Sequence, residues 1–489
     1  MQQIMAFSEI IASISYWIWG WPFIILCLAA GLYFSIRTRF LQVRYIKQML
    51  GLLFHAKSSQ SGISSLQAFM LALSGRVGTG NIAGVATAIA LGGPGAVFWM
   101  WIIAFFGAGT AYIEASLGQI YKEKIDGNYR GGPAYYILKG LGIKWYAFAF
   151  AGMAIVALGI FMPGVQANAI CSAFTNAFDI DKRITAGIIV VLLSVIIFGG
   201  VKRIAKVAEI VTPFMAAGYL IIAFVILASN YQHIPAMFML IIKSAFGLHP
   251  ALSGVVGAAI SMGIKRGIYS NEAGQGSAPH AAAAAEVSHP TEQGLVQAFS
   301  VYVDTLLVCS ATAFIILATG MYRVYDSAAA TNVIVDGMGL PDGMYEYGPI
   351  NTQMAVDAHI PGFGSGFVAI ALFFFAFTTI MSYYFQAETN VYFLFRKKQA
   401  NFYAINSLRI GMLFVIYFGA INAMTLAWDM ADIGVGLMAW FNLIAILLLH
   451  KVAFKTFDNY EKQLKDGISK PVFNPQKLQI KNAGEWEST

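Results

Sequence analysis

The stretch Ala72–Ala86, ALSGRVGTGNIAGVA, places a polar, glycine-rich centre inside an otherwise apolar run. Its flanks are apolar enough to belong to a helix that crosses a membrane. Its centre holds three glycines, an arginine, a threonine and an asparagine. Glycine costs a helix interior about 1 kcal/mol relative to alanine, and unwound backbone is tolerated at bilayer depth only where protein or a water-filled cavity satisfies it. The stretch therefore predicts a helix that is broken within the membrane.

A second stretch has the same character. Residues Gly263–His280 read GIKRGIYSNEAGQGSAPH, and they again place glycines and polar residues within an apolar span. We expect Ser277 to cap the helix that restarts after this break, with Pro279 in its first turn. Interrupted helices at corresponding positions of two halves indicate the central binding site of a secondary transporter.

The composition indicates a membrane protein. Of 489 residues, 58% are hydrophobic and 11% are charged, whereas a soluble domain has about 25% charged residues. The N-terminal run has no basic segment or small-residue cleavage site, so we interpret it as a retained helix rather than a signal peptide. We predict an all-α polytopic protein with about eleven transmembrane helices, at residues 12–36, 64–91, 95–121, 146–171, 184–200, 205–229, 250–287, 295–320, 363–394, 402–425 and 430–451.

The positive charges predict the orientation. With the N-terminus outside, 24 of the 31 lysines and arginines fall in loops or the tail on the cytoplasmic side. The C-terminus is then cytoplasmic, in a bacterial inner or plasma membrane. The net charge of +7 reflects this topology and does not indicate a nucleic-acid partner.

The two predicted breaks divide the chain. Residues 1–63 form a first helix and a basic loop, residues 64–229 a first group of five helices, and residues 250–451 a second group. Each group opens with a broken helix, and an odd number of spans makes the two groups inverted in topology. Residues 452–489 form a cytoplasmic tail. The acidic external loop 321–362 is either an ordered flap or a solvated loop.

Other functional classes fit the sequence less well. The three cysteines, Cys27, Cys171 and Cys309, have neither zinc-ligand nor disulfide spacing. The seven histidines are scattered, and no catalytic triad, phosphate-binding loop or dinucleotide fingerprint is present, so we expect no enzyme and no organic cofactor. Channels also use unwound backbone, usually in rings of symmetric subunits, whereas both breaks here lie in one chain. The sequence does not define an oligomeric state.

Five motifs make the chain resemble a known family. They are GRVGTGNIAGVA (75–86), GGPGAVFWMW (92–101), RGGPAYYI (130–137), SNEAGQGSAP (270–279) and FAFTTI (375–380). Together they are similar to the alanine/glycine:cation symporters, also called sodium/alanine symporters. That family resembles the leucine-transporter (LeuT) superfamily, whose core consists of two inverted repeats of five helices. The resemblance implies sodium-coupled uptake of a small neutral amino acid, with proton coupling as the alternative.

The resemblance also implies a substrate site at the two breaks. Backbone N–H groups of Gly78, Thr79, Gly80 and Asn81, at the positive end of a half-helix, suit a carboxylate. Carbonyls of Ala273, Gly274, Gln275 and Gly276 suit an ammonium group, and the Gln275 side chain is a candidate for direct contact. The alternative is that these glycines only allow close helix packing.

Sodium is a hard cation that prefers oxygen ligands. The resemblance implies a sodium site formed by the carbonyls of Ser74, Val77 and Phe375 with the hydroxyls of Thr378 and Thr379. The alternative is that both threonine hydroxyls bind carbonyls of their own helix, as is common in membranes.

Several further residues have two interpretations. Gln166 either contacts substrate or forms an interhelical hydrogen bond. Many family members have tryptophan where this chain has Tyr383, and the smaller side chain with a hydroxyl predicts a pocket that accepts glutamine or serine beside alanine and glycine. Arg76 and Glu272, one in each break, are expected to neutralise each other. Lys265 and Arg266 are assigned to an inner vestibule.

Overall fold

The computed structural model describes residues 2–54, 61–327, 330, 332–341, 343–344, 346–422 and 424–487. The α-helices are α1 (Gln2–Ile18), α2 (Trp21–Arg37), α3 (Leu41–Arg44), α4 (Ile46–Leu52), α5 (Ser65–Arg76), α6 (Val85–Gly92), α7 (Gly95–Ile120), α8 (Pro133–Tyr136), α9 (Lys144–Val156), α10 (Met162–Phe178), α11 (Lys182–Ile197), α12 (Gly200–Ser229), α13 (Ile234–Ala245), α14 (Val256–Asn271), α15 (Ala278–Ala284), α16 (Pro290–Val301), α17 (Ser310–Thr319), α18 (Pro349–Asp357), α19 (Gly364–Leu394), α20 (Lys398–Ile421) and α21 (Met424–Lys465). Wider π-helical turns occupy Gly80–Gly84, Ile137–Leu141, Ala157–Phe161 and Tyr302–Cys309. The strands are β1 (Glu123–Ile125), β2 (Asn128–Arg130), β3 (Arg323–Tyr325) and β4 (Val333–Asp336), paired as two antiparallel hairpins.

Helices long and apolar enough to cross a membrane dominate the fold. Within the described residues there are 8 such helices, or up to 9 if the bent pair Tyr231–Ala245 and Pro250–Asn271 is one span. The eight are Ile10–Arg37, Gly95–Ile120, Lys144–Phe178, Gly200–Ser229, Pro290–Thr319, Gly364–Leu394, Gln399–Ile421 and Trp428–Lys465. Each of them overlaps one of the eleven predicted ranges. The other three ranges contain shorter helices, α5 with α6, α11, and α14 with α15, so the count of eleven stays a prediction.

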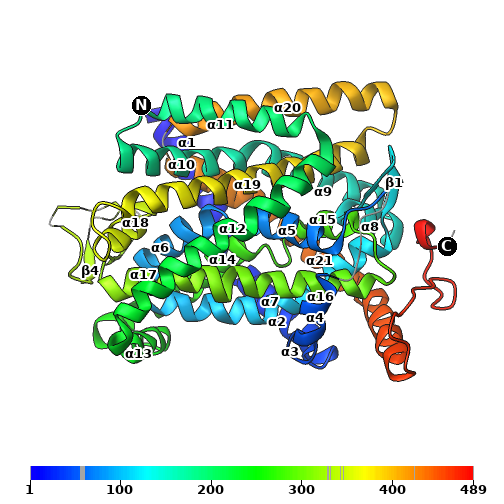
Figure 1. The fold of residues 1–489 in the computed structure, drawn as a ribbon, viewed down its shortest axis with the longest axis horizontal. Coiled ribbons are helices and arrows are strands. Elements are labelled where there is room, and N and C mark those ends of the chain that lie inside the picture. The colour runs from blue at the N-terminus through cyan, green and yellow to red at the C-terminus, as the bar shows by residue number, and fades with distance from the viewer. Residues whose placement is uncertain are drawn as a thin grey trace.

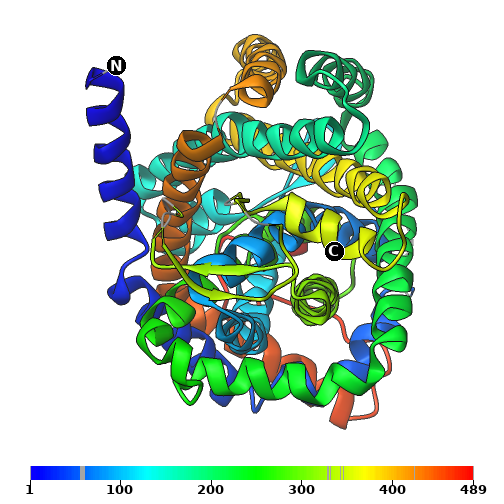
Figure 2. The ribbon, with the colours of Figure 1, turned by 90° about the vertical axis from the view of Figure 1, so that its left-hand side faces the viewer.

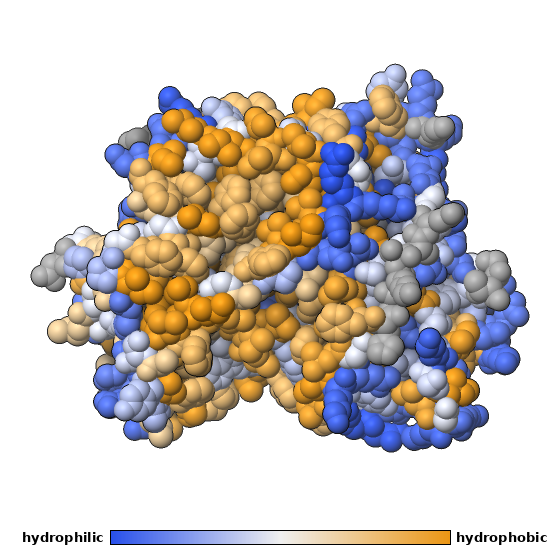
Figure 3. All heavy atoms as spheres, viewed as in Figure 1, coloured by the Kyte–Doolittle hydropathy of each residue, from blue (hydrophilic) through white to orange (hydrophobic). Residues whose placement is uncertain are grey.

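The outer surface is that of a membrane protein. Large apolar side chains are exposed along the outer helices, including Val191 and Val195 of α11 and Phe214 and Phe224 of α12, which are 62 to 77% exposed. Figure 3 shows a broad apolar belt across the middle of the molecule, with hydrophilic residues gathered toward its ends. Exposed apolar patches of this extent mark contact with lipid or protein. The chain is therefore a multi-pass membrane protein.

The long helices run side by side between two differently capped ends. One end carries β4, α18 and α13, and the other carries β1, α8 and the end of the chain (Figure 1). Viewed from the first end, outer helices surround inner ones, and β3 and β4 lie in front of the inner helices (Figure 2). The described part of the loop 321–362 thus contains a hairpin and helix α18. Arg323 holds the hairpin by an ion pair of 2.7 Å to Asp336.

The C-terminal segment folds back on the opposite end. Helix α21 continues to Lys465, well beyond the predicted span 430–451. The following residues lie against helix ends: Phe473 N–H donates to the Ser288 carbonyl at 3.0 Å, and Trp486 Nε1 donates to the Gln119 carbonyl at 3.0 Å. The predicted tail is therefore partly helix and partly a segment that contacts the bundle.

Candidate functional site at the two helix breaks

The first break lies where the opening sequence predicts it. Helix α5 starts at a capping box, in which Gln67 N–H donates to Ser64 Oγ (3.1 Å) and Ser64 N–H donates to Gln67 Oε1 (3.0 Å). The helix ends at Arg76, and Val77 is extended, with φ −76° and ψ 90°. The chain then resumes as the π-helical turn Gly80–Gly84 and α6. Residues 71–86 are all buried, so the freed polar groups need partners inside the protein.

Side chains cap the first break in this structure. The Gly78 N–H donates to Asn81 Oδ1 at 2.8 Å. The Thr79 N–H and hydroxyl both donate to Gln166 Oε1 of α10, at 3.0 and 2.7 Å. Two of the N–H groups assigned to a substrate carboxylate thus already bind side-chain oxygens, and Gln166 forms the interhelical hydrogen bond that was one of its two interpretations.

The second break also lies at its predicted position. Helix α14 ends at Asn271, Glu272 takes a left-handed φ of +56°, and Gly274 and Gly276 have φ of +81° and +82°. These values favour glycine, which explains the two glycines. Ser277 occupies the N-cap position of α15, but its side chain makes no capping hydrogen bond, contrary to prediction. Its hydroxyl instead donates to Glu272 Oε2 at 2.8 Å.

A buried carboxyl group from another helix accepts backbone N–H groups of the second break. Glu114 of α7 accepts the N–H groups of Gly274 and Gly276, both at 3.2 Å. Asn442 of α21 donates to Glu114 Oε2 at 2.7 Å and to the Gly274 carbonyl at 3.0 Å. The sequence interpretation missed both residues. A lone glutamate within an apolar span was the available signal for Glu114, because intramembrane ionisable residues are functional candidates by default.

Asp304 connects the two breaks. Its carboxylate accepts Asn81 Nδ2 of the first break at 2.7 Å and the hydroxyl of Ser270, beside the second break, at 2.9 Å. Thr305 supplies a third donor at 2.7 Å. Asp304 belongs to a π-helical turn and is fully buried. This residue was also missed, although it too is an acidic residue within a predicted span.

Oxygen atoms converge between α19 and the end of α5. The Thr379 hydroxyl lies 2.8 Å from the Ser74 carbonyl, 3.3 Å from the Val77 carbonyl and 3.0 Å from the Phe375 carbonyl. Thr379 thus reaches across to the first break. The Thr378 hydroxyl is bonded to carbonyls of its own helix, Phe374 at 2.9 Å and Phe375 at 3.0 Å. The structure therefore brings together the five residues predicted to bind sodium. The Thr379 hydroxyl contacts the first break, whereas the Thr378 hydroxyl binds carbonyls of its own helix.

The remaining predicted substrate contacts are buried beside the breaks. Tyr383 lies one helical turn after Thr379 on α19 and is 1% exposed. The Gln275 side chain is fully buried, and neither of its polar atoms has a hydrogen-bond partner in the described structure. Ala273 donates its N–H to Asn271 Oδ1 at 3.0 Å.

Three basic residues in the broken spans bind polar or acidic partners inside the protein. Arg76 and Glu272 form no ion pair within 4.0 Å among the described residues; the Arg76 guanidinium instead donates to Ser300 Oγ and to the Gln297 carbonyl. Lys265 and Arg266, assigned to an inner vestibule, both bind Asp432 of α21, at 2.6 and 3.3 Å. Because Asp432 is 1% exposed, it neutralises these cations within the protein.

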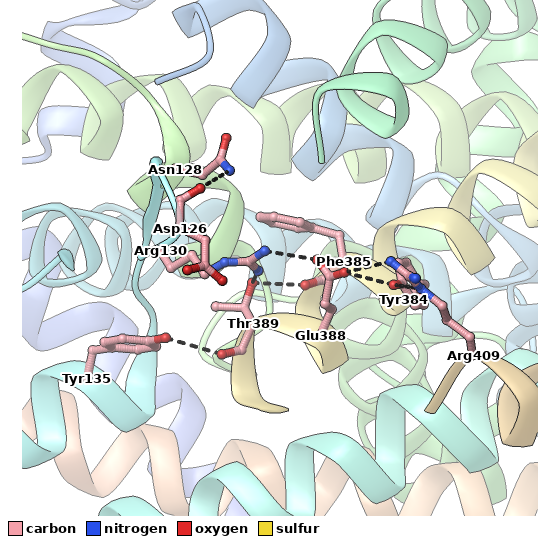
Figure 4. A network of polar contacts seen from close by, with 9 residues as sticks. All are labelled: Asp126, Asn128, Arg130, Tyr135, Tyr384, Phe385, Glu388, Thr389 and Arg409. Carbon is pink, nitrogen blue, oxygen red and sulfur yellow. Dashed lines mark hydrogen bonds and ion pairs between the residues drawn. The ribbon is translucent and has the colours of Figure 1, made fainter. Parts of the chain in front are cut away.

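A separate buried network joins the β1–β2 hairpin to the helix bundle (Figure 4). Arg130 binds Glu388 of α19 at 3.1 Å, and both side chains are 3% exposed. Tyr384 donates to the other Glu388 oxygen at 2.8 Å, and Arg409 of α20 lies 3.6 Å from it. Tyr135 donates to the Thr389 carbonyl at 3.2 Å. The RGGPAYYI motif thus anchors the hairpin to α19.

Comparison with known proteins identifies the family. The model of the sodium:alanine symporter family matches residues 4–475. The chain belongs to this family. Membership places it among symporters and rules out the enzyme hypothesis.

Similar proteins cover almost the entire chain. One is YrbD of Bacillus subtilis (strain 168), provisionally described as a sodium/proton-dependent alanine carrier, which is 56% identical over 480 residues and 98% of each chain. Another is the sodium/proton-dependent alanine carrier of Bacillus sp. (strain PS3), 49% identical over 90% of this chain and 97% of the relative. A third is GlnT of B. subtilis, provisionally described as a sodium/glutamine symporter, 43% identical over 99% of this chain and 96% of the relative.

Proposed function

We propose that this chain is a sodium-coupled symporter that carries small neutral amino acids into the cell by alternating access. The observation that carries the proposal is the convergence of Thr379 Oγ1 with the carbonyls of Ser74 and Val77. These oxygens carry no formal charge, come from two elements that a cation would tie together, and suit a hard cation such as sodium. Sodium bound there fixes the end of α5 against α19.

The amino acid is assigned to the space between the two breaks. Its carboxylate replaces Asn81 Oδ1 as the acceptor of the Gly78 N–H and Gln166 Oε1 as the acceptor of the Thr79 N–H, and it also accepts the N–H of Gly80. Binding would then move two side chains that at present cap the break. Gln275 and Tyr383 supply polar contacts for the substrate side chain. On this basis we assign alanine, glycine, serine and glutamine to the substrate range.

The transport cycle follows from an inverted-repeat architecture, which we propose on the basis of the two breaks. One N-terminal helix precedes two repeats of the LeuT type, residues 64–229 and 250–451, within eleven spans. The N-terminus is outside, the C-terminus is cytoplasmic, and loop 321–362 is external. Sodium binding completes the amino-acid site, and the helices rock to release both solutes inside.

Proton coupling is the second candidate. Three fully buried carboxyl groups, Glu114, Glu272 and Asp304, surround the breaks. Carboxyl groups within a membrane are frequent members of proton pathways. Two relatives are also described as sodium/proton-dependent carriers.

Uptake into proteoliposomes tests the proposal. Labelled alanine or glutamine is added under an inward sodium gradient, with choline in place of sodium, or under a proton gradient alone. We expect accumulation only with sodium. Accumulation that is independent of sodium and follows the proton gradient would favour proton coupling over sodium coupling. If neither amino acid shows saturable uptake, both candidates are rejected.

A further inference from the structure

Polar atoms without partners cluster at the second break. In the described structure, the buried atoms with no hydrogen-bond partner include Tyr269 OH, Asn271 Nδ2, Glu272 Oε1 and both amide atoms of Gln275. Native proteins satisfy most buried polar atoms, so each exception calls for an explanation. Four such residues within seven positions indicate that this segment binds a polar ligand.

Glu272 is the charged member of the cluster. Its side chain is fully buried. Ser277 donates to one carboxyl oxygen at 2.8 Å, and the Tyr383 hydroxyl lies near the carboxyl. Within the part of the chain that the structure describes, no lysine, arginine or histidine nitrogen lies within 4.0 Å of it, and Arg76 attracts it only from a longer distance. A buried carboxylate is costly unless a cation or several donors compensate it. A positively charged ligand would supply that compensation.

The two neighbouring acids do not need such a ligand. Glu114 already accepts two backbone N–H groups and the Asn442 amide. Asp304 accepts three side-chain donors. Of the three buried acids at the breaks, Glu272 therefore has the carboxyl oxygen that is left for a ligand.

The Glu272 carboxyl also faces the first break. A Cβ placed on Gly75 would lie 3.4 Å from Glu272 Oε2 and 2.8 Å from Ser382 Oγ. Ser382 is three residues after Thr379 on α19 and thus on the same helix face. The carboxyl is therefore close to both breaks and about one helical turn along α19 from the oxygen cluster.

We infer that Glu272 is the counter-charge for the ammonium group of the transported amino acid. This inference rests on the proposed function and assigns a charged side chain to a group for which the sequence predicted uncharged partners. The substrate then enters with both of its charges compensated: its carboxylate by the N–H groups of the first break and its ammonium by Glu272. Solutes that lack a protonated amino group are excluded.

Equilibrium binding tests the inference. Labelled alanine is bound at saturating sodium to purified wild type, to Glu272→Gln and to Glu209→Gln, a matched control on α12 away from the breaks. We expect Glu272→Gln to weaken alanine binding by roughly 30-fold or more. We expect Glu209→Gln to leave alanine binding unchanged. Sodium binding without substrate should be equal in all three proteins, and the melting temperature of Glu272→Gln should not fall.

A competition arm uses wild type alone and covers the case in which Glu272→Gln does not fold. L-lactate has a hydroxyl in place of the ammonium group of alanine. We expect a 100-fold excess of lactate not to displace alanine, which means that lactate binds at least about 100-fold more weakly. Competition by lactate at alanine-like concentrations would overturn the inference. So would unchanged alanine affinity in Glu272→Gln, or a loss of sodium affinity with alanine affinity intact. A wild type that binds none of the four assigned amino acids would instead reject the proposed function.

Discussion

Replacing Gly78 by alanine should impair sodium coupling through a defined contact. Gly78 has no left-handed φ, so alanine fits its backbone conformation. A Cβ there would collide with Thr379 Oγ1 and lie 3.0 Å from Gln166 Oε1 and 3.2 Å from Thr379 Cβ. To restore an ordinary van der Waals separation, the Thr379 hydroxyl must retreat by about 1 Å. This movement changes its distances to the carbonyl oxygens of Ser74, Val77 and Phe375, which share its single proton.

The expected cost follows from this overpacking. An extra methyl group forced into a well-packed site costs about 1–3 kcal/mol. In sodium binding this corresponds to a roughly 5- to 150-fold change. The assay is alanine uptake into proteoliposomes as a function of external sodium. We expect the half-saturating sodium concentration of Gly78→Ala to rise by that factor.

Gly84→Ala is the matched control for this prediction. It lies in the same broken span, and the nearest atom to its added Cβ is Arg266 Cδ at 4.0 Å. Alanine should therefore be tolerated there, with unchanged sodium dependence. If Gly78→Ala and Gly84→Ala show the same sodium dependence, the contact between Gly78 and Thr379 has no role in coupling.

The remaining predictions concern stability and selectivity. Glu388→Ala leaves the buried Arg130 without its ion-pair partner and should destabilise the protein by about 3–5 kcal/mol, measured by thermal unfolding. Asp458→Asn, which removes an ion pair to Arg37 with side chains 48 and 46% exposed, should change stability by less than about 1 kcal/mol; equal shifts in the two variants would contradict this interpretation. Tyr383→Trp enlarges a side chain that is 1% exposed, and it should reduce glutamine uptake more than alanine uptake in a competition assay. An unchanged ratio would show that Tyr383 does not set the size of the pocket.

The helix breaks could be predicted from the sequence because their cause is local. Several glycines beside polar residues in an apolar run disfavour a continuous helix wherever they occur in a fold. The opening sequence and SNEAGQGSAP therefore marked positions that the structure confirms as breaks. Family resemblance identified Thr378 and Thr379 together, and only the structure distinguishes the hydroxyl that reaches the first break.

The partners across the bundle could not be predicted in this way. Glu114 and Asn442 are 328 positions apart, and only the packing of α7 against α21 brings them together. The partners of Arg76 could not be predicted for the same reason. Glu272 has the opposite charge, but packing places oxygen atoms of α16 against the Arg76 guanidinium. The sequence shows which charged residues fall within apolar spans, whereas the tertiary structure determines which of them are in contact.

The most direct test of the sodium assignment is alanine uptake by Thr379→Val across a range of sodium concentrations. Valine keeps the branched shape of threonine and removes the hydroxyl that meets the carbonyls of Ser74 and Val77. The account predicts a half-saturating sodium concentration at least tenfold above wild type, the equivalent of about 1.4 kcal/mol, while alanine affinity at saturating sodium is retained. A Thr379→Val protein with wild-type sodium dependence would contradict the assignment of the coupling site to these oxygens.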